Sequence, residues 1–393
     1  MLAEIVLAVT ALLGHAVLWV GLNNRLHAVR LKRSHLKAIS ALVHFGTVAV
    51  PLAIAWWLYR EQSQPGDWQA VFERNPIALF YALFCIGMAL VHVPRWIYVR
   101  FIGLRNAKRI GQCIKVLDIA ERLGKWPTRG WKFAVGRRIP GNQVMQVELV
   151  EKRVPLPNLP AELDGLRVLH LSDLHLSGRV ESSFFIEVIQ EINALEPDLI
   201  LLSGDVFDTA ECIPWIEAVL SPAQAKYGKF FVLGNHDDRL LDTQSARNAV
   251  AATGFVDLGG RSATLTIGSQ TVFLVGNELP WFRSSLSDED LLRCQSAQPP
   301  LKILLSHSPD QIRWARKHGF DLMLCGHTHG GQIQFPIVGP VVCPSWYGVR
   351  YAEGLFLERP TAMHVSRGVS GLFPLRINSR PAVDLLILRK KTL

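Results

Sequence analysis

Three long apolar runs occupy the first quarter of the 393-residue chain. They cover Leu2–Leu22, Ala38–Tyr59 and Pro76–Val93, and Glu4 is the only charged residue in any of them. A helix of about 20 apolar residues crosses the ~30 Å hydrocarbon core of a bilayer. The pattern therefore predicts three transmembrane helices within residues 1–94, of which the third has the shortest apolar run.

The charges between these runs predict an orientation. The first connection, residues 23–37, holds five Lys/Arg and no acid, whereas the second, residues 60–75, holds two basic and three acidic residues. Because cytoplasmic loops of membrane proteins are enriched in Lys and Arg, we expect the N-terminus outside and everything after Arg95 inside. If the third run does not span, the C-terminal half moves to the opposite side.

A strongly basic segment follows the third run. Residues 95–139 contain 12 Lys/Arg and 2 Asp/Glu, a net charge of +10, whereas the whole chain carries +9. A basic excess beside a hydrophobic helix favours contact with anionic lipid headgroups. No nucleic-acid-binding motif accompanies the charge, so a nucleic acid partner is not expected. Residues 95–141 are predicted to be a basic juxtamembrane linker with an amphipathic helix over Ile114–Leu123, and residues 142–393 a globular domain.

Short apolar runs, each ending in polar residues, recur through the second half of the chain. The runs are Leu166–Leu171, Leu199–Leu202, Phe230–Leu233, Thr271–Val275, Ile303–Leu305, Leu322–Leu324, Ala362–Val365 and Val383–Leu388. Between the first two, Ser183–Ala194 has apolar residues at helical spacing. Buried strands that alternate with helices predict an α/β fold class. In such folds ligands bind beyond the carboxyl ends of the strands.

Five of these runs are followed at once by residue types that bind metals. They are Asp173 and His175; Asp205 and Asp208; Asn235, His236 and Asp237; His307; and His327 and His329. Imidazole and carboxylate ligands suit Zn, Fe or Mn. Two divalent ions about 3.5–4 Å apart counter the charge of a phosphate ester and supply hydroxide near neutral pH. Any one of these motifs alone is weak, but the ordered set predicts phosphoester hydrolysis at a dinuclear metal centre.

This ordered set resembles the calcineurin-like metallophosphoesterase superfamily over Leu166–Leu388. The resemblance implies a four-layer α/β/β/α domain behind the transmembrane helices. It also implies two divalent metal ions (Mn, Fe, Zn or Mg), one held by Asp173, His175, Asp205 and His329, the other by Asp205, Asn235, His307 and His327. His236 would contact the phosphate and protonate the leaving group, and Asp237 would orient it. The role of Asp208 stays open; one interpretation is that it contacts a metal ligand rather than the metal itself.

Further residues resemble the bacterial membrane-associated branch of the superfamily. They are Cys325–Pro336, Ser366–Gly368 and Pro374–Ile377. One group in that branch is similar to enzymes that cleave the pyrophosphate of UDP-2,3-diacylglucosamine. The resemblance implies an integral protein of the bacterial inner membrane and a phosphate-containing, lipid-linked substrate. One departure is Pro381–Ala382, where the family pattern usually has Glu after the proline.

Two other functions compete with this interpretation. The first is a phosphodiesterase or phosphatase that acts on soluble substrates and is anchored only for location. The second is a non-catalytic, metal-binding scaffold, which the retention of all seven ligand positions and His236 argues against. His170 is interpreted as a residue of the core or a support of a ligand, and His318 and His364 as structural or exposed residues. Arg367 and Arg376 are expected either to reach a substrate phosphate or to form structural ion pairs.

Overall fold

The computed structural model describes residues 2–61, 75–103, 111–282, 300–371 and 373–390, with a few positions between 286 and 292. The chain divides into two compact units, Met1–Arg105 and Asn106–Leu393. Each unit is described by itself.

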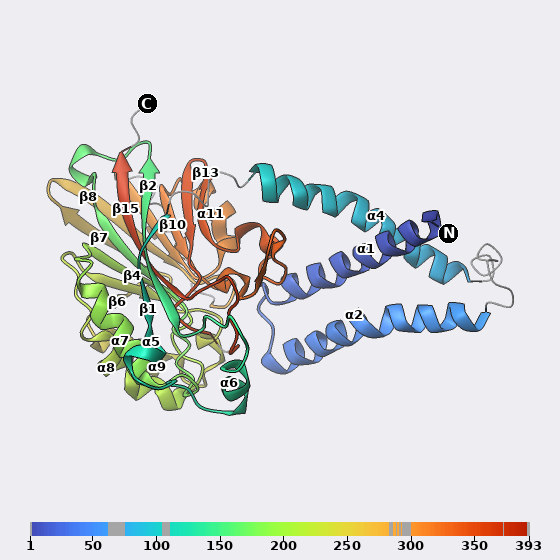
Figure 1. Cartoon of the computed structure of the whole chain (residues 1–393). Coiled ribbons are helices and arrows are strands. Elements are labelled where there is room, and N and C mark those ends of the chain that lie inside the picture. The colour runs from blue at the N-terminus through green and yellow to red at the C-terminus, as the bar shows by residue number, and fades with distance from the viewer. Residues whose placement is uncertain are drawn as a thin grey trace. The chain divides into compact units, whose positions relative to one another are not determined.

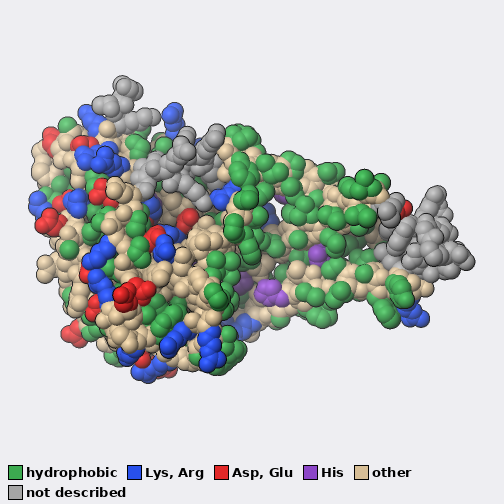
Figure 2. Space-filling view, viewed as in Figure 1, with side chains coloured by type: hydrophobic (Ala, Val, Ile, Leu, Met, Phe, Trp, Pro, Cys, Tyr) green, Lys and Arg blue, Asp and Glu red, His purple; other side chains and the backbone are tan. Residues whose placement is uncertain are grey.

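Three long apolar helices form the first unit (Figure 1). They are α1 (Leu2–Leu26), α2 (Arg33–Glu61) and α4 (Pro76–Tyr98), and α4 continues into a π-helical turn, η1 (Val99–Gly103). All three are long and apolar enough to cross a membrane, which confirms the three predicted helices. Their outward side chains are hydrophobic (Figure 2), for example Phe45 and Phe80, which are more than 70% exposed. Such surfaces are stable in lipid rather than in water.

Polar contacts inside this unit join the helices. The ring of His15 on α1 bonds the hydroxyl of Tyr81 on α4 at 2.7 Å and the carbonyl of Thr47 on α2 at 3.0 Å. Gly14 lies against the backbone of Cys85, where an added Cβ would meet the carbonyl oxygen at 1.7 Å. Small residues permit this close helix approach, and a bonded histidine is less costly in lipid than an unpaired one.

Two large β-sheets dominate the described part of the second unit. The seven-stranded sheet has the order β1-β2-β15-β3-β4-β5-β6, and the six-stranded sheet has the order β13-β14-β10-β9-β8-β7. The strands of the first are β1 (Gly111–Asp118), β2 (Gln146–Leu156), β3 (Arg167–Leu171), β4 (Leu199–Ser203), β5 (Lys229–Val232), β6 (Phe255–Asp257) and β15 (Ala382–Lys390). Those of the second are β7 (Ser262–Ile267), β8 (Gln270–Asn277), β9 (Leu301–Ser306), β10 (Leu322–Cys325), β13 (Gly354–Glu358) and β14 (Thr361–Val365). A small hairpin pairs β11 (Gln334–Phe335) with β12 (Gly339–Pro340).

The helices lie outside the sheets (Figure 1). They are α5 (Ile119–Arg122), α6 (Trp131–Gly136), α7 (Ser182–Asn193), α8 (Ile216–Leu220), α9 (Thr243–Ala252) and α11 (Ile312–Lys317). Short 3₁₀ turns are η2 (Ala161–Leu163), η3 (Ala210–Trp215), η4 (Asp237–Arg239), η5 (Pro309–Gln311), η6 (His329–Gly331) and η7 (Gly348–Tyr351).

Side chains that alternate between the two faces of each strand explain how the sheets and helices are layered. On β4, Leu199 and Leu201 belong to the core between the two sheets, whereas Ile200 and Leu202 belong to the core beneath α7, α8 and α9. Side chains of a strand point to opposite faces in turn, so a strand that is apolar throughout must be covered on both faces. With α11 beside β14, the layers run helix, sheet, sheet, helix, and the predicted α/β fold class is confirmed.

The eight predicted strand runs and the helix predicted over residues 183–194 all correspond to elements of the structure.

The segment expected to be a linker contains regular structure. The helix predicted over Ile114–Leu123 is wrong for its first half, because residues up to Asp118 form β1, paired antiparallel with β2. Leu117 and Ile119 are fully buried in the core beneath the helices. Residues 104–110 of the expected linker lie outside the described part of the chain.

Candidate metal centre

The sequence-predicted ligands converge at one end of both sheets. β3, β4 and β5 run parallel in the first sheet, and β8, β9 and β10 run parallel in the second. The side chains that follow β3, β4, β5, β9 and β10 therefore leave the sheets at the same edge. All seven predicted ligands are buried or nearly so there.

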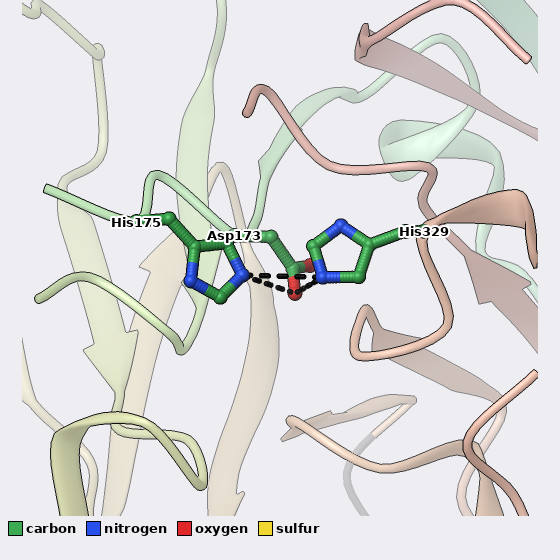
Figure 3. Close-up of side chains that lie close together, drawn as sticks. All are labelled: Asp173, His175 and His329. Atoms are coloured by element: carbon green, nitrogen blue, oxygen red, sulfur yellow. Dashed lines mark hydrogen bonds and ion pairs between the residues drawn. The ribbon is translucent and has the colours of Figure 1, made fainter. Parts of the chain in front are cut away.

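A first cluster contains Asp173, His175 and His329 (Figure 3). Oδ1 of Asp173 lies 3.7 Å from Nε2 of His175 and 3.5 Å from Nε2 of His329. The two ring nitrogens are 3.1 Å apart. One oxygen and two nitrogens thus point into one small space, as ligands of a single ion do.

A second cluster contains Asp205, His307 and His327, whose ligand atoms lie within 4.8 Å of one another. Nε2 of His307 is 3.3 Å from Oδ2 of Asp205 and 3.1 Å from Oδ1 of Asn235. The same Asp205 oxygen lies 3.6 Å from Nε2 of His175 in the first cluster. Asp205 therefore stands between the clusters, where a bridging ligand would be.

Hydrogen bonds fix the tautomers of two of these histidines. Nδ1 of His307 donates to the carbonyl of Ser203 at 2.7 Å, and Nδ1 of His175 lies 3.2 Å from Oδ2 of Asp208. A neutral imidazole that carries its proton on Nδ1 presents a lone pair at Nε2. In such neutral rings both Nε2 atoms would face the Oδ2 oxygen of Asp205 as acceptors, an arrangement that a bound cation satisfies.

The fit of a metal is also visible at His327. Its Nε2 is buried and has no hydrogen-bond partner among the described residues. Buried polar atoms are nearly always paired, and His327 is a member of the second cluster. The donor set of nitrogen, carboxylate and amide oxygen suits first-row divalent ions, so the residues present fit two metal ions.

The backbone at the ligands is strained. Five of the ligand residues have a left-handed φ between 51° and 69°: Asp173, His175, Asp205, His327 and His329. A non-glycine residue in this region costs of order 1 kcal/mol or more, and such residues gather at functional sites. At Gly234 an added Cβ would lie 2.3 Å from Oδ1 of Asp205, so only glycine permits this close approach.

The buried carboxylates and histidines of the site shift one another's pKa values. Although burial opposes it, neighbouring histidines hold the pKa of Asp205 well below its usual range. Burial also opposes protonation of His307, yet the carboxylates of Asp205 and Asp173 raise its pKa to about 9. Burial lowers the pKa of His329 to about 3. Carboxylates that stay ionised in a dry site need cations beside them.

His236 lies beside the clusters and is the most accessible of these histidines. Its ring contacts that of His175 edge to face at 4.6 Å, and Nδ1 bonds Oδ1 of Asp208. Nη1 of Arg239 approaches Nε2 of the same ring at 3.0 Å. Arg239 was not among the site residues predicted from the sequence; its position three residues after His236 was the available signal.

The carboxylate of Asp237, predicted to orient His236, lies against backbone N–H groups. It accepts the backbone N–H groups of Val206, Phe207 and Gly234 at 2.8–3.2 Å. It therefore joins the turns after β4 and β5. The carboxylate that contacts the His236 ring is that of Asp208, which supports both His236 and His175.

The two late arginines are held by structural contacts. Arg367 pairs with Glu148 at 2.6 Å and with Glu353 at 3.4 Å. Arg376 is buried and donates to the carbonyls of His329, Arg367, Ser379 and Ser370, and its Nη2 lies 3.3 Å from Nδ1 of His329. Arg367 thus forms the predicted ion pair, whereas Arg376 braces the loop that carries a ligand.

Comparisons with known proteins point to one family. Residues 166–331 match the family described as calcineurin-like phosphoesterase. The chain is 31% identical over 255 residues to the uncharacterized metallophosphoesterase YkuE of Bacillus subtilis, covering 62% of this chain and 86% of that protein. It is 33% identical over 231 residues to phosphodiesterase YaeI of Escherichia coli, covering 56% and 81%. It is 26% identical over 272 residues to a transmembrane protein with metallophosphoesterase domain of Danio rerio, covering 63% and 59%.

Proposed function

The chain belongs to the calcineurin-like phosphoesterase family of metal-dependent hydrolases, and from that membership we propose that it is a membrane-anchored, dinuclear-metal phosphoesterase. The proposed ligands are Asp173, His175, Asp205 and His329 for one ion and Asp205, Asn235, His307 and His327 for the other. The observation that carries the proposal is the convergence of these buried donors on Asp205, whose Oδ2 faces His175 and His307.

Two divalent ions bound there would lower the pKa of a water molecule and neutralise charge on a phosphoryl group. The protein's own contribution to proton transfer is His236. Asp208 accepts from Nδ1 of this ring, so Nε2 is the nitrogen that exchanges a proton with the leaving oxygen. Arg239, which approaches the same nitrogen, is placed to bind a phosphoryl oxygen as a bidentate donor.

The proposed substrate is a phosphodiester or pyrophosphate that is itself anchored in a membrane, such as UDP-2,3-diacylglucosamine. Three helices able to span a bilayer support this choice, because a membrane-held enzyme meets lipid-linked substrates at high local concentration. A soluble phosphoester is the competing substrate class, since phosphodiesterase YaeI and the other relatives carry names that specify no lipid.

The proposed location is the bacterial inner membrane, with the catalytic unit in the cytoplasm. The charge distribution of the connections supports this orientation. A reporter enzyme that is active only in the cytoplasm, fused after Leu393, should be active. Activity of a periplasmic reporter at the same position would reverse the topology without affecting the metal site.

Hydrolysis by the purified, detergent-solubilised chain with added Mn²⁺ tests the function directly. Bis-p-nitrophenyl phosphate and UDP-2,3-diacylglucosamine would be compared, with Asp205→Ala as the inactive control. Release of UMP far faster than turnover of the generic ester supports the lipid-linked substrate. Turnover of the generic ester alone favours a soluble substrate, and failure to hydrolyse either, despite bound metal, favours the non-catalytic scaffold.

A further inference from the structure

A row of buried polar side chains interrupts the apolar core between the two sheets. On β2, β3, β4, β14 and β15 the members of the row are Lys152, His170, Ser203, His364 and Asp384. Each lies two residues from an apolar residue of the core between the sheets, such as Val154 beside Lys152 and Val168 beside His170. The period of two therefore points all five side chains into that core.

These side chains form one continuous chain of hydrogen bonds that ends at a proposed metal ligand. Nζ of Lys152 lies 2.8 Å from Nε2 of His364, and Nδ1 of His364 lies 2.9 Å from Nδ1 of His170. Nε2 of His170 lies 2.8 Å from Oγ of Ser203. From there the chain runs to Oγ of Ser172 at 2.8 Å and to Oδ2 of Asp173 at 2.5 Å.

The chemistry of the two ends sets the direction of every bond. An ammonium group only donates and a carboxylate only accepts. Lys152 therefore donates to Nε2 of His364, which leaves the His364 proton on Nδ1, where it is donated to His170. His170 must then carry its own proton on Nε2 and donate it to Ser203. Ser203 donates to Ser172, and Ser172 donates to Asp173.

The surroundings keep both histidines neutral, as this direction requires. Burial lowers the pKa of His170 well below its usual range, with a contribution from His364. Burial and the nearby Lys152 lower the pKa of His364. The positive end of the row is balanced by Asp384, whose Oδ1 lies 2.5 Å from Nζ of Lys152. Apart from Lys152, whose side chain is 14% exposed, the members of the row are almost completely buried.

The two oxygens of the Asp173 carboxylate, at the end of the row, have different surroundings. Oδ2 of Asp173 receives the hydroxyl of Ser172. Oδ1 is the oxygen nearest to the rings of His175 and His329 (Figure 3). A rotation of the carboxylate would break the bond from Ser172, so the row holds Oδ1 towards the first cluster.

We propose that His170 and His364, acting through Ser203 and Ser172, are positioning residues that hold the Asp173 carboxylate oriented for the ion of the first cluster. The inference rests on the proposed metal function of that cluster. Groups that support metal ligands in this way typically change metal affinity about 10–100-fold when they are removed.

A matched pair of variants separates this role from simple packing. Glutamine and leucine have similar volumes, but only glutamine can accept from His364 and donate to Ser203 at once. His170→Gln should therefore preserve Mn²⁺ affinity within about threefold, whereas His170→Leu should weaken binding at one site by about 10-fold or more. If the position served packing alone, the apolar leucine would be the better replacement in a buried site.

The measurement is Mn²⁺ titration of the full-length protein in detergent, with thermal unfolding in EDTA as a test that each variant folds. His318→Gln, a histidine outside the row, should bind Mn²⁺ like wild type. Ser203→Ala removes one hydroxyl from the row but keeps the backbone carbonyl that accepts from His307. It should therefore weaken Mn²⁺ binding as His170→Leu does. If His170→Leu does not fold, Ser203→Ala tests the positioning role in its place.

The possible outcomes separate failure of the metal centre from failure of the positioning role. Wild-type protein that binds no Mn²⁺ overturns the metal centre and the positioning role with it. Wild-type binding that is unchanged in His170→Leu or Ser203→Ala overturns the positioning role alone. Equal weakening in His170→Gln and His170→Leu also overturns it, because continuity of donors and acceptors would then be irrelevant.

Discussion

Replacing Gly326 by alanine tests how closely the turn after β10 must approach the turn after β3. An added Cβ would lie 1.9 Å from Oγ of Ser172 and 2.2 Å from Oδ2 of Asp173. Contact between such atoms requires about 3.5 Å, so the turn or both oxygens must move by roughly 1.5 Å. Ser172 and Asp173 are fully buried and cannot turn into solvent. Overpacking of this kind destabilises by about 1–3 kcal/mol, and we expect the upper end of that range.

The assay is thermal unfolding of the purified full-length protein, measured first in EDTA and then with Mn²⁺. A loss of about 3 kcal/mol corresponds to a fall in Tm of roughly 6–12 °C for a unit of this size. The additional rise in Tm that Mn²⁺ produces should also shrink, because it depends on the affinity of the folded state for the ion. Both effects follow from displacement of Ser172 and Asp173.

Gly371→Ala is the matched control, since it adds the same methyl group near the same site. Its Cβ would meet Nε2 of Gln332 at 3.4 Å and the His329 ring at 3.7 Å, which are ordinary contacts. Its Tm should therefore stay within about 2 °C of wild type. The reasoning is refuted if Gly326→Ala melts as Gly371→Ala does and keeps the full response to Mn²⁺.

Three further predictions follow from the site and the row beside it. Asp205→Ala should retain fewer than one Mn²⁺ per chain by elemental analysis, because its Oδ2 faces both clusters; two retained ions would contradict the bridging role. Burial raises the pKa of Asp384, but Lys152 and His364 hold it well below its usual range. Its stabilising contribution is therefore present above about pH 4 and lost as the pH falls through the lower folded value. Asp384→Asn should lower Tm more at pH 7 than near pH 2, and a difference independent of pH would argue against this. In ¹⁵N-histidine spectra of the metal-free protein, His364 should carry its proton on Nδ1 and His170 on Nε2; the reverse tautomers would contradict the direction of the hydrogen-bond row.

Several features of this protein follow from the sequence because their causes are local. An apolar run of about 20 residues specifies a membrane-length helix through its own composition. A strand followed by a tight, polar turn is also a local signal, so the segments that carry the ligands could be predicted before their contacts were known. The parallel arrangement then brings strand ends together as a general property of α/β folds.

Other features depend on contacts between distant segments. His170 and His364 are 194 residues apart, on different sheets, and no spacing in the sequence indicates that they meet. The same holds for β1, because only its pairing with β2, an element that begins 28 residues after β1 ends, makes it a strand.

The roles of neighbouring carboxylates were likewise decided by the tertiary structure. Asp208 and Asp237 both follow strands and both suit the support of a histidine, so the sequence does not distinguish them. The packing of the turns after β4 and β5 places Asp237 on backbone N–H groups and Asp208 on two imidazole rings. Residue types at strand ends thus determine which chemistry is available, whereas the direction of each side chain, set by packing between strands far apart in sequence, decides which group performs it.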